Sequence, residues 1–184
     1  LDRSSAASDV YKRQGQGKGR VVLQTFEKDS LKELQKEMPN TPKILLLWVG
    51  PGSIEPKSAQ TFAESGETTK AAYYAKQEPK DAAEFEKWVD EAKSLGAIGT
   101  GPSAELTNHG DQSYTDLVKP EMNKLTHDKG LLVHVYTVDE PVDFEKVMKA
   151  GVDGIFTNRA AELLKFYKRW PSSSVQDLLK DNGY

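Results

Sequence analysis

The 184-residue sequence contains no cysteine, which excludes disulfide scaffolds, thiolate zinc sites and cysteine nucleophiles. Neither sign of charge dominates, because 25 basic and 28 acidic side chains give a formal net charge of −3. Without a basic field, nucleic acid is not expected as a partner. Long apolar runs are also missing: the longest, Ile44 to Val49, is far shorter than the roughly 20 residues that a membrane span needs. The sequence therefore predicts no transmembrane segment.

The two ends of the chain differ from its middle. Residues 1–14 show neither a helical nor a strand period and lack the basic and apolar regions of a secretory signal. We expect them to be a non-native, adapter-like leader or a disordered end. Residues 170–184 form a polar tail with one short helix expected at 175–179. The folded part is therefore expected within residues 15–169.

The middle of the chain alternates between strand-like and helix-like segments. Strands are expected at Val21–Phe26, Ile44–Val49, Ala97–Gly101, Leu131–Val138 and Val152–Thr157. Helices are expected over Asp81–Leu95, over Tyr114–Asp128 and from Pro141 to Gly151. A further helix is expected to begin at a Ser30–Glu33 capping box. The last expected helix follows Asn158 and has a buried stripe of Ala160, Leu163, Leu164 and Tyr167. Residues 50–79 are expected to form a loop with one short helix at 58–64.

Repeated strand-then-helix units imply parallel strands covered by helices, in either a doubly wound sheet or a (β/α)8 barrel. The strand Ile44–Val49 is apolar on both faces, as parallel strands are. A complete barrel needs eight strands and typically about 250 residues. The five expected strands therefore cannot make a whole barrel.

One stretch carries a family resemblance. VHVYTVDEPVDFEKVMKAGVDGIFTNR, residues 133–159, is similar to the C-terminal end of the glycerophosphodiester phosphodiesterase family. Upstream, VVLQTFEKDSLKEL resembles the family's fifth strand and following helix, and LLLW resembles its sixth strand. The likeness runs from about Arg20 to Tyr167, with Asn158 and Ala160 in place of the usual aspartate and proline. The Tyr136-Thr137 pair and AIGTGP resemble the periplasmic-type branch, which favours an extracytoplasmic location.

The resemblance implies an α/β fold that is the C-terminal half of a (β/α)8 barrel. It implies hydrolysis of a small glycerophosphodiester to glycerol 3-phosphate and an alcohol, with Ca²⁺ or Mg²⁺ and two histidines in the full-length protein. The family's HRG and other metal-site motifs are absent from this sequence. We therefore expect no catalytic residue and no metal ligand here, and an inactive fragment. Two alternatives stay open: a sphingomyelinase D type of barrel, and a non-catalytic barrel-derived binding or structural module.

Four side chains are predicted to bind substrate. Strand alternation puts His134 and Tyr136 on one face of their strand, and Gln24 and Phe26 on one face of theirs. The resemblance implies that Tyr136 is an apolar wall beside the glycerol. The alternative for Tyr136 is packing under the next helix, and for Gln24 a place in the layered core.

Other candidates have structural interpretations. Trp48 is expected in the core, and His109 and His127 at the surface. Asp153 is expected to fix the turn before the last strand. Asp139 and Glu140 begin a helix, where carboxylates favour the positive end and Asp139 can cap. Asn158 is expected to cap the last helix in the same way.

Overall fold

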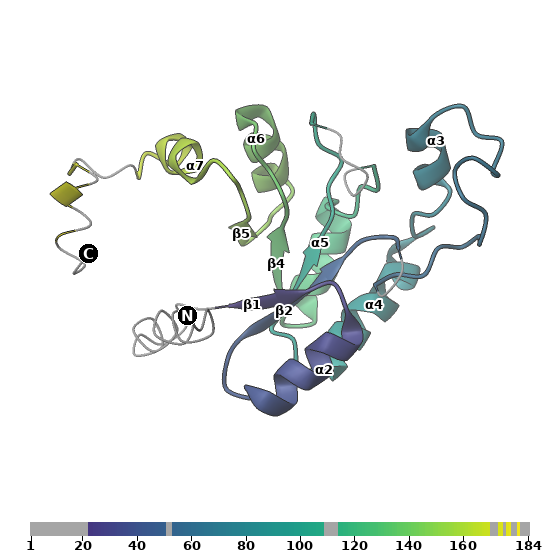
Figure 1. Cartoon of the computed structure of the whole chain (residues 1–184), viewed down its shortest axis with the longest axis horizontal. Coiled ribbons are helices and arrows are strands. Elements are labelled where there is room, and N and C mark those ends of the chain that lie inside the picture. The colour runs from purple at the N-terminus through teal and green to yellow at the C-terminus, as the bar shows by residue number, and fades with distance from the viewer. Residues whose placement is uncertain are drawn as a thin grey trace, which may run out of the picture.

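The protein is a five-stranded parallel sheet with helices along one side (Figure 1). The structure, a computed structural model, describes residues 22–50, 53–108 and 114–169, together with positions 173, 174, 176, 177 and 180. The strands are β1 (Leu23–Thr25), β2 (Lys43–Leu47), β3 (Gly99–Pro102), β4 (Leu132–Val135) and β5 (Gly154–Ile155). The helices are α2 (Lys28–Glu37), α3 (Lys70–Ala75), α4 (Ala82–Ser94), α5 (Pro120–Asp128), α6 (Pro141–Lys149) and α7 (Ala160–Phe166).

Each strand pairs in parallel with the next strand along the chain, so the order is β1-β2-β3-β4-β5. A doubly wound sheet reverses its strand order and carries helices on both faces. Here the sheet curls in one direction as half of a barrel, which confirms the predicted fold class and excludes the doubly wound alternative. The five expected strands are all present, each shorter than the apolar segment that predicted it.

Strand β2 is buried along its whole length, as its apolar sequence predicts. On the outer face, Leu45 and Leu47 pack with helix residues such as Phe85 of α4. On the inner face, Ile44 and Leu46 pack instead with Tyr136, which follows β4. The two faces of the sheet therefore have separate apolar clusters, and the inner one receives no helix residue.

Strand β3 separates β2 from β4 but places glycines on its inner face. A Cβ atom at Gly101 would lie 2.3 Å from Leu46 Cδ2 and 3.0 Å from the His134 carbonyl oxygen. A Cβ at Gly99 would lie 2.7 Å from Ile44 Cδ1. Side chains from β2 therefore occupy the space that β3 leaves empty.

Two predicted helix starts and the position of one predicted short helix are wrong. Helix α2 begins at Lys28, not at a Ser30–Glu33 capping box, because the Thr25 hydroxyl accepts a hydrogen bond from Glu27 N at 3.0 Å and turns the chain directly after β1. Helix α5 begins at Pro120 rather than near residue 114, since a proline lacks the N–H that a helix interior needs. Residues 58–64 contain no helix and turn only from residue 62, and the short helix of this loop is α3, capped by the Thr69 hydroxyl.

Asp139 and Asn158 do not cap helices, contrary to prediction. Asp139 Oδ1 accepts hydrogen bonds from Asn158 N at 2.7 Å and from the Thr157 hydroxyl at 3.0 Å. Asp139 Oδ2 accepts one from Asn158 Nδ2 at 3.0 Å. The carboxylate therefore joins the turn after β4 to the turn after β5. The residues at the N-caps of α6 and α7 are Glu140 and Arg159, and neither side chain makes a capping bond.

The predicted buried stripe of α7 is only partly present. Leu163 packs against the cluster around Phe144 of α6. Leu164 and Tyr167 are exposed by 37% and 41%, and Ala160 is exposed as well. Among the described residues, α6 is the main neighbour of α7, so Leu163 is covered while Leu164 and Tyr167 stay exposed.

Part of the sequence lies outside the described residues. This holds for the expected leader at 1–14, for His109 and for most of the tail with its expected helix at 175–179. Within the described ranges, no helix is both long and apolar enough to cross a membrane.

Gly101→Ala is expected to lower the free energy of unfolding by about 1–3 kcal/mol, because the added methyl overlaps Leu46. Combining it with Leu46→Ala, which makes room for that methyl, should cost less than the sum of the two single substitutions by at least about 0.5 kcal/mol. Urea unfolding of the four proteins measures this coupling. Strict additivity would contradict the packing described for β3.

Asp139→Asn is expected to lower the free energy of unfolding by about 1–2 kcal/mol at pH 7. Burial opposes ionisation of Asp139, but hydrogen bonds from Asn158 and Thr157 outweigh it, so the pKa lies below its ordinary value. The stabilisation is complete above the unfolded pKa of about 3.9 and is lost as the pH falls through the lower folded pKa. Urea unfolding from pH 7 to pH 2 should show the two proteins converging only in acid.

The control is Asp29→Asn, because Asp29 is an exposed carboxylate that pairs with Lys32 at the surface. It should leave the free energy of unfolding close to that of the parent chain. A difference between the parent and Asp139→Asn that stays constant down to pH 2 would show that the carboxylate charge has no part in the turn.

Candidate functional site

Three aromatic side chains meet beyond the carboxyl ends of the strands. Phe26 follows β1, Trp48 follows β2 and Tyr136 follows β4. The ring centroids of Phe26 and Tyr136 are 5.3 Å apart and those of Phe26 and Trp48 are 6.3 Å apart, both edge to face. We call these three residues the strand-end cluster. Barrel enzymes build their active sites at this end of the strands.

Tyr136 is fixed within the cluster by its hydroxyl group. The hydroxyl donates a hydrogen bond to the Leu47 carbonyl oxygen at 3.2 Å, reaching across β3. Tyr136 is 7% exposed. Burial raises the pKa of its phenol far above the ordinary value, and a hydrogen bond with Ser103 only partly offsets this. The side chain is therefore a neutral, rigid wall and not a base.

His134 lies on the same face as Tyr136, two residues deeper along β4. It is half-buried, and its ring meets Phe156 edge to face at 6.0 Å. Burial lowers the pKa of His134, and the negative charge of Asp153 opposes this in part. The imidazole is therefore neutral at neutral pH. Its depth places it below the cluster rather than within it.

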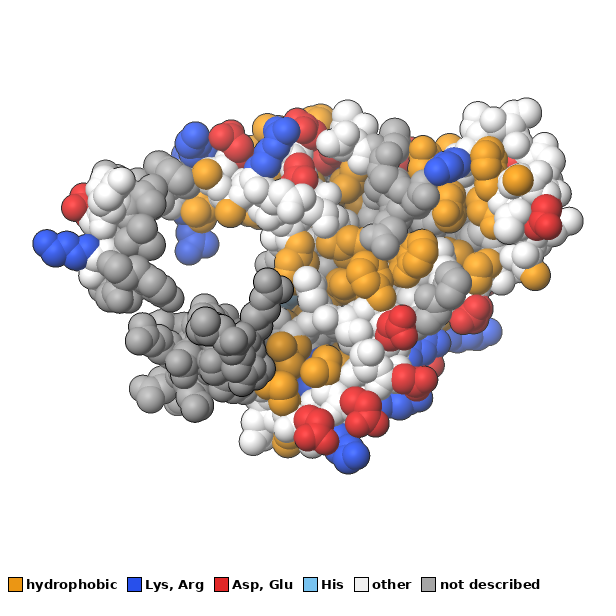
Figure 2. Space-filling view, viewed as in Figure 1, with side chains coloured by type: hydrophobic (Ala, Val, Ile, Leu, Met, Phe, Trp, Pro, Cys, Tyr) orange, Lys and Arg blue, Asp and Glu red, His pale blue; other side chains and the backbone are white. Residues whose placement is uncertain are grey.

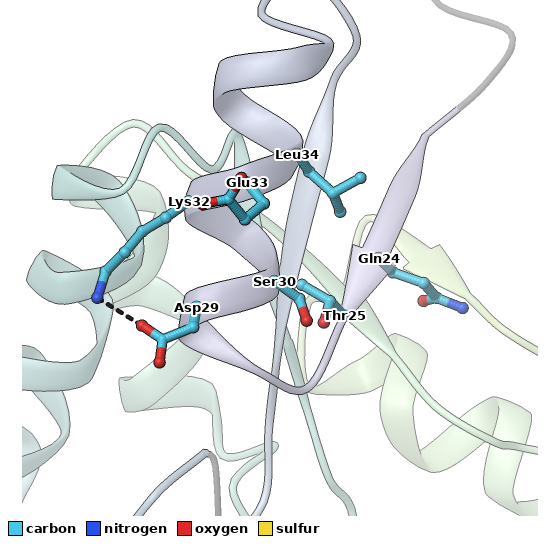
Figure 3. Close-up of a pocket in the computed structure, with 7 residues that line it drawn as sticks. All are labelled: Gln24, Thr25, Asp29, Ser30, Lys32, Glu33 and Leu34. Atoms are coloured by element: carbon cyan, nitrogen blue, oxygen red, sulfur yellow. Dashed lines mark hydrogen bonds and ion pairs between the residues drawn. The ribbon is translucent and has the colours of Figure 1, made fainter.

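Gln24 does not join the strand-end cluster. Its side chain is exposed and lines a hollow of about 650 Å³ beside β1 and α2. Figure 3 shows that it points away from the α2 side chains of that hollow, which include the Asp29–Lys32 ion pair. Of the four predicted substrate-binding residues, the structure brings Phe26 and Tyr136 into contact, with His134 behind them and Gln24 apart.

Gly50 is a residue that sequence reasoning missed. A Cβ atom there would lie 2.3 Å from the Trp48 ring, so only glycine allows the indole to fold over the chain at this point. Trp48 is half-buried at the margin of the inner-face apolar cluster. The signal in the sequence is a glycine two residues after a tryptophan at the end of a strand.

Asp153 has the structural role that was predicted for it. Its Oδ2 atom accepts a hydrogen bond from Val133 N at 2.8 Å, and its own amide donates to the Val133 carbonyl oxygen at 2.9 Å. His127 Nε2 also lies 2.8 Å from Asp153 Oδ2, so this surface histidine is paired. These contacts join β4 to the start of β5, away from the strand-end cluster.

The described residues do not fit a divalent cation. No three histidine, aspartate or glutamate side chains among them converge on one point. Ca²⁺ and Mg²⁺ need about six or more oxygen ligands. Asp139, at the strand ends, already uses both oxygens on Thr157 and Asn158. We therefore derive no chemical step through a metal.

Comparisons with known proteins point to one family. Residues 2–162 match the model of the glycerophosphoryl diester phosphodiesterase family. A glycerophosphodiester phosphodiesterase of Bacillus subtilis is 28% identical over 140 residues, which are 76% of this chain and 34% of the relative. The chain thus spans about a third of that relative's length.

Two solved structures have the same fold. A protein described as a glycerophosphoryl diester phosphodiesterase from Silicibacter pomeroyi matches with a TM-score of 0.50 and 21% identity, over 88% of this chain and 41% of its own. A second protein, described as a glycerophosphodiester phosphodiesterase from Galdieria sulphuraria, matches with a TM-score of 0.51 and 21% identity, over 90% of this chain and 49% of its own. At this identity they show the fold alone.

Gly50→Ala is expected to displace the Trp48 indole from the strand-end cluster, because the new methyl would overlap the ring. The tryptophan emission of the chain should shift to the red as Trp48 enters water. The matched control is the same substitution in a Trp48→Phe background, where emission should not change. A red shift that persists there would mean that the glycine acts on another tryptophan.

Proposed function

The chain belongs to the glycerophosphoryl diester phosphodiesterase family, and on this basis we propose that it forms one side of a barrel that hydrolyses glycerophosphodiesters. The products are glycerol 3-phosphate and the alcohol that leaves. The observation that supports the proposal is the strand-end cluster, which lies at the end of the strands where barrels of this class bind substrate.

Within this proposal the strand-end cluster is an apolar wall for the glycerol. Phe26 and Trp48 offer ring faces and edges, and the Tyr136 hydroxyl is already bonded to Leu47. Such rings contact the C–H groups of a glycerol and leave its hydroxyl groups to polar partners. His134, deeper on the same face and neutral, is proposed as one such partner.

Gln24 is proposed to reach the substrate from the other side of Phe26. It lies on the same face of β1, and its exposed amide is available to a ligand at the open side of the sheet. An amide both donates and accepts hydrogen bonds, which suits a glycerol hydroxyl group.

The catalytic steps are proposed to use side chains from strands other than the five described. A phosphodiester gains negative charge on the way to its transition state, and a bound Ca²⁺ or Mg²⁺ offsets such charge. The strand-end cluster contains no charged group. We therefore propose that this chain contributes a wall of the substrate site but, by itself, does not hydrolyse the substrate.

We expect the chain to bind sn-glycerol 3-phosphate weakly. We also expect that it does not hydrolyse glycerophosphodiesters to glycerol 3-phosphate, even in the presence of Ca²⁺ or Mg²⁺. Nuclear magnetic resonance titration measures the dissociation constant. Phe26→Ala should weaken binding about tenfold by removing apolar contact. Tyr136→Phe keeps the ring and should weaken binding less than Phe26→Ala does, because the hydroxyl bonds to Leu47 and not to the ligand.

Tyr167→Phe, directly after α7, controls for the loss of the hydroxyl group of an exposed tyrosine outside the strand-end cluster. An unchanged dissociation constant in Phe26→Ala would refute the proposal that the strand-end cluster forms a wall for the glycerol. Release of glycerol 3-phosphate by the chain alone would instead show that the catalytic groups lie within it.

A further inference from the structure

Among the described residues, each end of the sheet has an unpaired edge. Strand β1 pairs only with β2, and strand β5 pairs only with β4. An edge strand presents N–H and C=O groups with which another strand can pair. The helices that follow these two strands, α2 and α7, lie at opposite ends of the curved layer of helices (Figure 1). The sheet therefore has two open ends, each made of one strand and one helix.

The end made of β5 and α7 exposes apolar side chains beside basic ones. Leu164 and Phe166 of α7 are each 37% exposed, and Tyr167, directly after it, is 41% exposed. Residues 160–169 also carry one acidic and three basic side chains. Figure 2 shows apolar and basic side chains next to each other in the region of α7. Clustered apolar surface with a charged rim is typical of a surface that binds another protein.

The end made of β1 and α2 carries the hollow of about 650 Å³ described above. Leu34 gives it an apolar side, and Gln24 lies at the edge of β1 (Figure 3). Its charged lining residues are two acidic ones, Asp29 and Glu33, and one basic one, Lys32. The hollow thus combines apolar surface with an excess of negative charge. It is complementary in charge to the end made of β5 and α7.

We propose that two copies of this chain associate about a two-fold axis, with β5 and α7 of one copy against β1 and α2 of the other. The inference rests on the fold and is independent of the proposed function. A two-fold axis makes each contact twice, so both open ends of both copies are covered at once. The apolar side chains of α7 enter the hollow of the other copy, and the basic side chains around α7 meet its carboxylates.

The direction of the strands fits this arrangement. All five strands run the same way, and a two-fold axis along the line about which the sheet curls preserves that direction. Strand β5 of one copy then continues the parallel sheet of the other. The carboxyl ends of all the strands lie at one mouth, where the strand-end clusters of the two copies face each other. The second copy brings no charged group in its own strand-end cluster, so the dimer is not expected to hydrolyse a diester.

The inner face supplies large side chains for the space that two copies enclose. Ten strands enclose a wider space than the eight strands of a small barrel, whose side chains just fill it. A Cβ atom at Gly99, on the inner face of β3, would lie 3.0 Å from the Leu132 Cβ, so Leu132 lies on this face. It is 39% exposed, and the half-buried His134 and Phe156 meet edge to face on the same side. Association removes these three side chains of each copy from solvent.

The first test is the mass of the full chain in solution, measured by analytical ultracentrifugation over a range of concentrations. We expect a single equilibrium between one copy of 20.4 kDa and two. Leu164→Glu should raise the dissociation constant of the dimer at least about tenfold, because it buries a charge in an apolar contact. Val142→Glu is the matched control, since Val142 on the neighbouring helix α6 is 62% exposed and lies outside the proposed contact.

Three outcomes would overturn the proposal. A chain that stays monomeric at every concentration would show that the open ends do not meet. Assemblies that keep growing with concentration would show that the ends meet without closing about a two-fold axis. Equal weakening by Val142→Glu and Leu164→Glu would show that the association does not use α7 in particular. The measurement on the unaltered chain needs no variant to fold.

The second test identifies which surfaces meet, using the lack of cysteine in the chain. A mixture of Glu33→Cys and Leu164→Cys, treated with a short bismaleimide, should give a mixed cross-linked dimer. Either variant alone should give little, because the two-fold axis brings unlike ends together. Glu33→Cys mixed with Val142→Cys is the control and should give none. Cross-linking of Leu164→Cys to itself in preference to Glu33→Cys would show that α7 meets α7, and it would overturn the arrangement even for a dimeric chain.

Discussion

The inner face of the sheet depends on one strand having almost no side chains there. Gly99 and Gly101 leave a gap along β3 that Ile44 and Leu46 of β2 fill from one side. Tyr136 crosses the same strand from β4 to reach the Leu47 carbonyl oxygen. Because packed interiors tolerate little extra volume, the strand-end cluster can form only if β3 has glycines at positions 99 and 101. The site is therefore shaped by the strand that supplies none of its aromatic rings.

Much of the fold could be predicted from the sequence because it depends on patterns of neighbouring residues. Ile44–Val49 is apolar throughout, and a strand of this kind is buried on both faces. Helix α4 followed from its one apolar face, and in the structure the Asp81 side chain caps its start. The barrel, as opposed to a doubly wound sheet, followed from the family resemblance and not from these patterns.

The helix caps that failed, at Asp139 and Asn158, depend on a contact between distant parts of the chain. Asp139 could cap a helix equally well by its sequence, but in the structure it binds a turn almost twenty residues later. Local rules cannot choose between two uses of one carboxylate. The candidate site had the same limit: alternation placed Gln24 and Phe26 on one face, but it could not show that Phe26 turns into the cluster while Gln24 stays at the edge. Gly50 is required by a close contact with the Trp48 ring, which no periodic pattern contains.

The contacts of Asp139 also have a consequence for how the protein opens. The carboxylate joins the last two strand-helix units through three hydrogen bonds, one of them to a backbone amide. Segments joined in this way tend to unfold and reclose together as one cooperative unit. The amide of Asn158, although it belongs to an exposed turn residue, should then exchange its hydrogen no faster than the interior of β4. A local opening that breaks these three hydrogen bonds would then release the turn after β4 and the turn after β5 together.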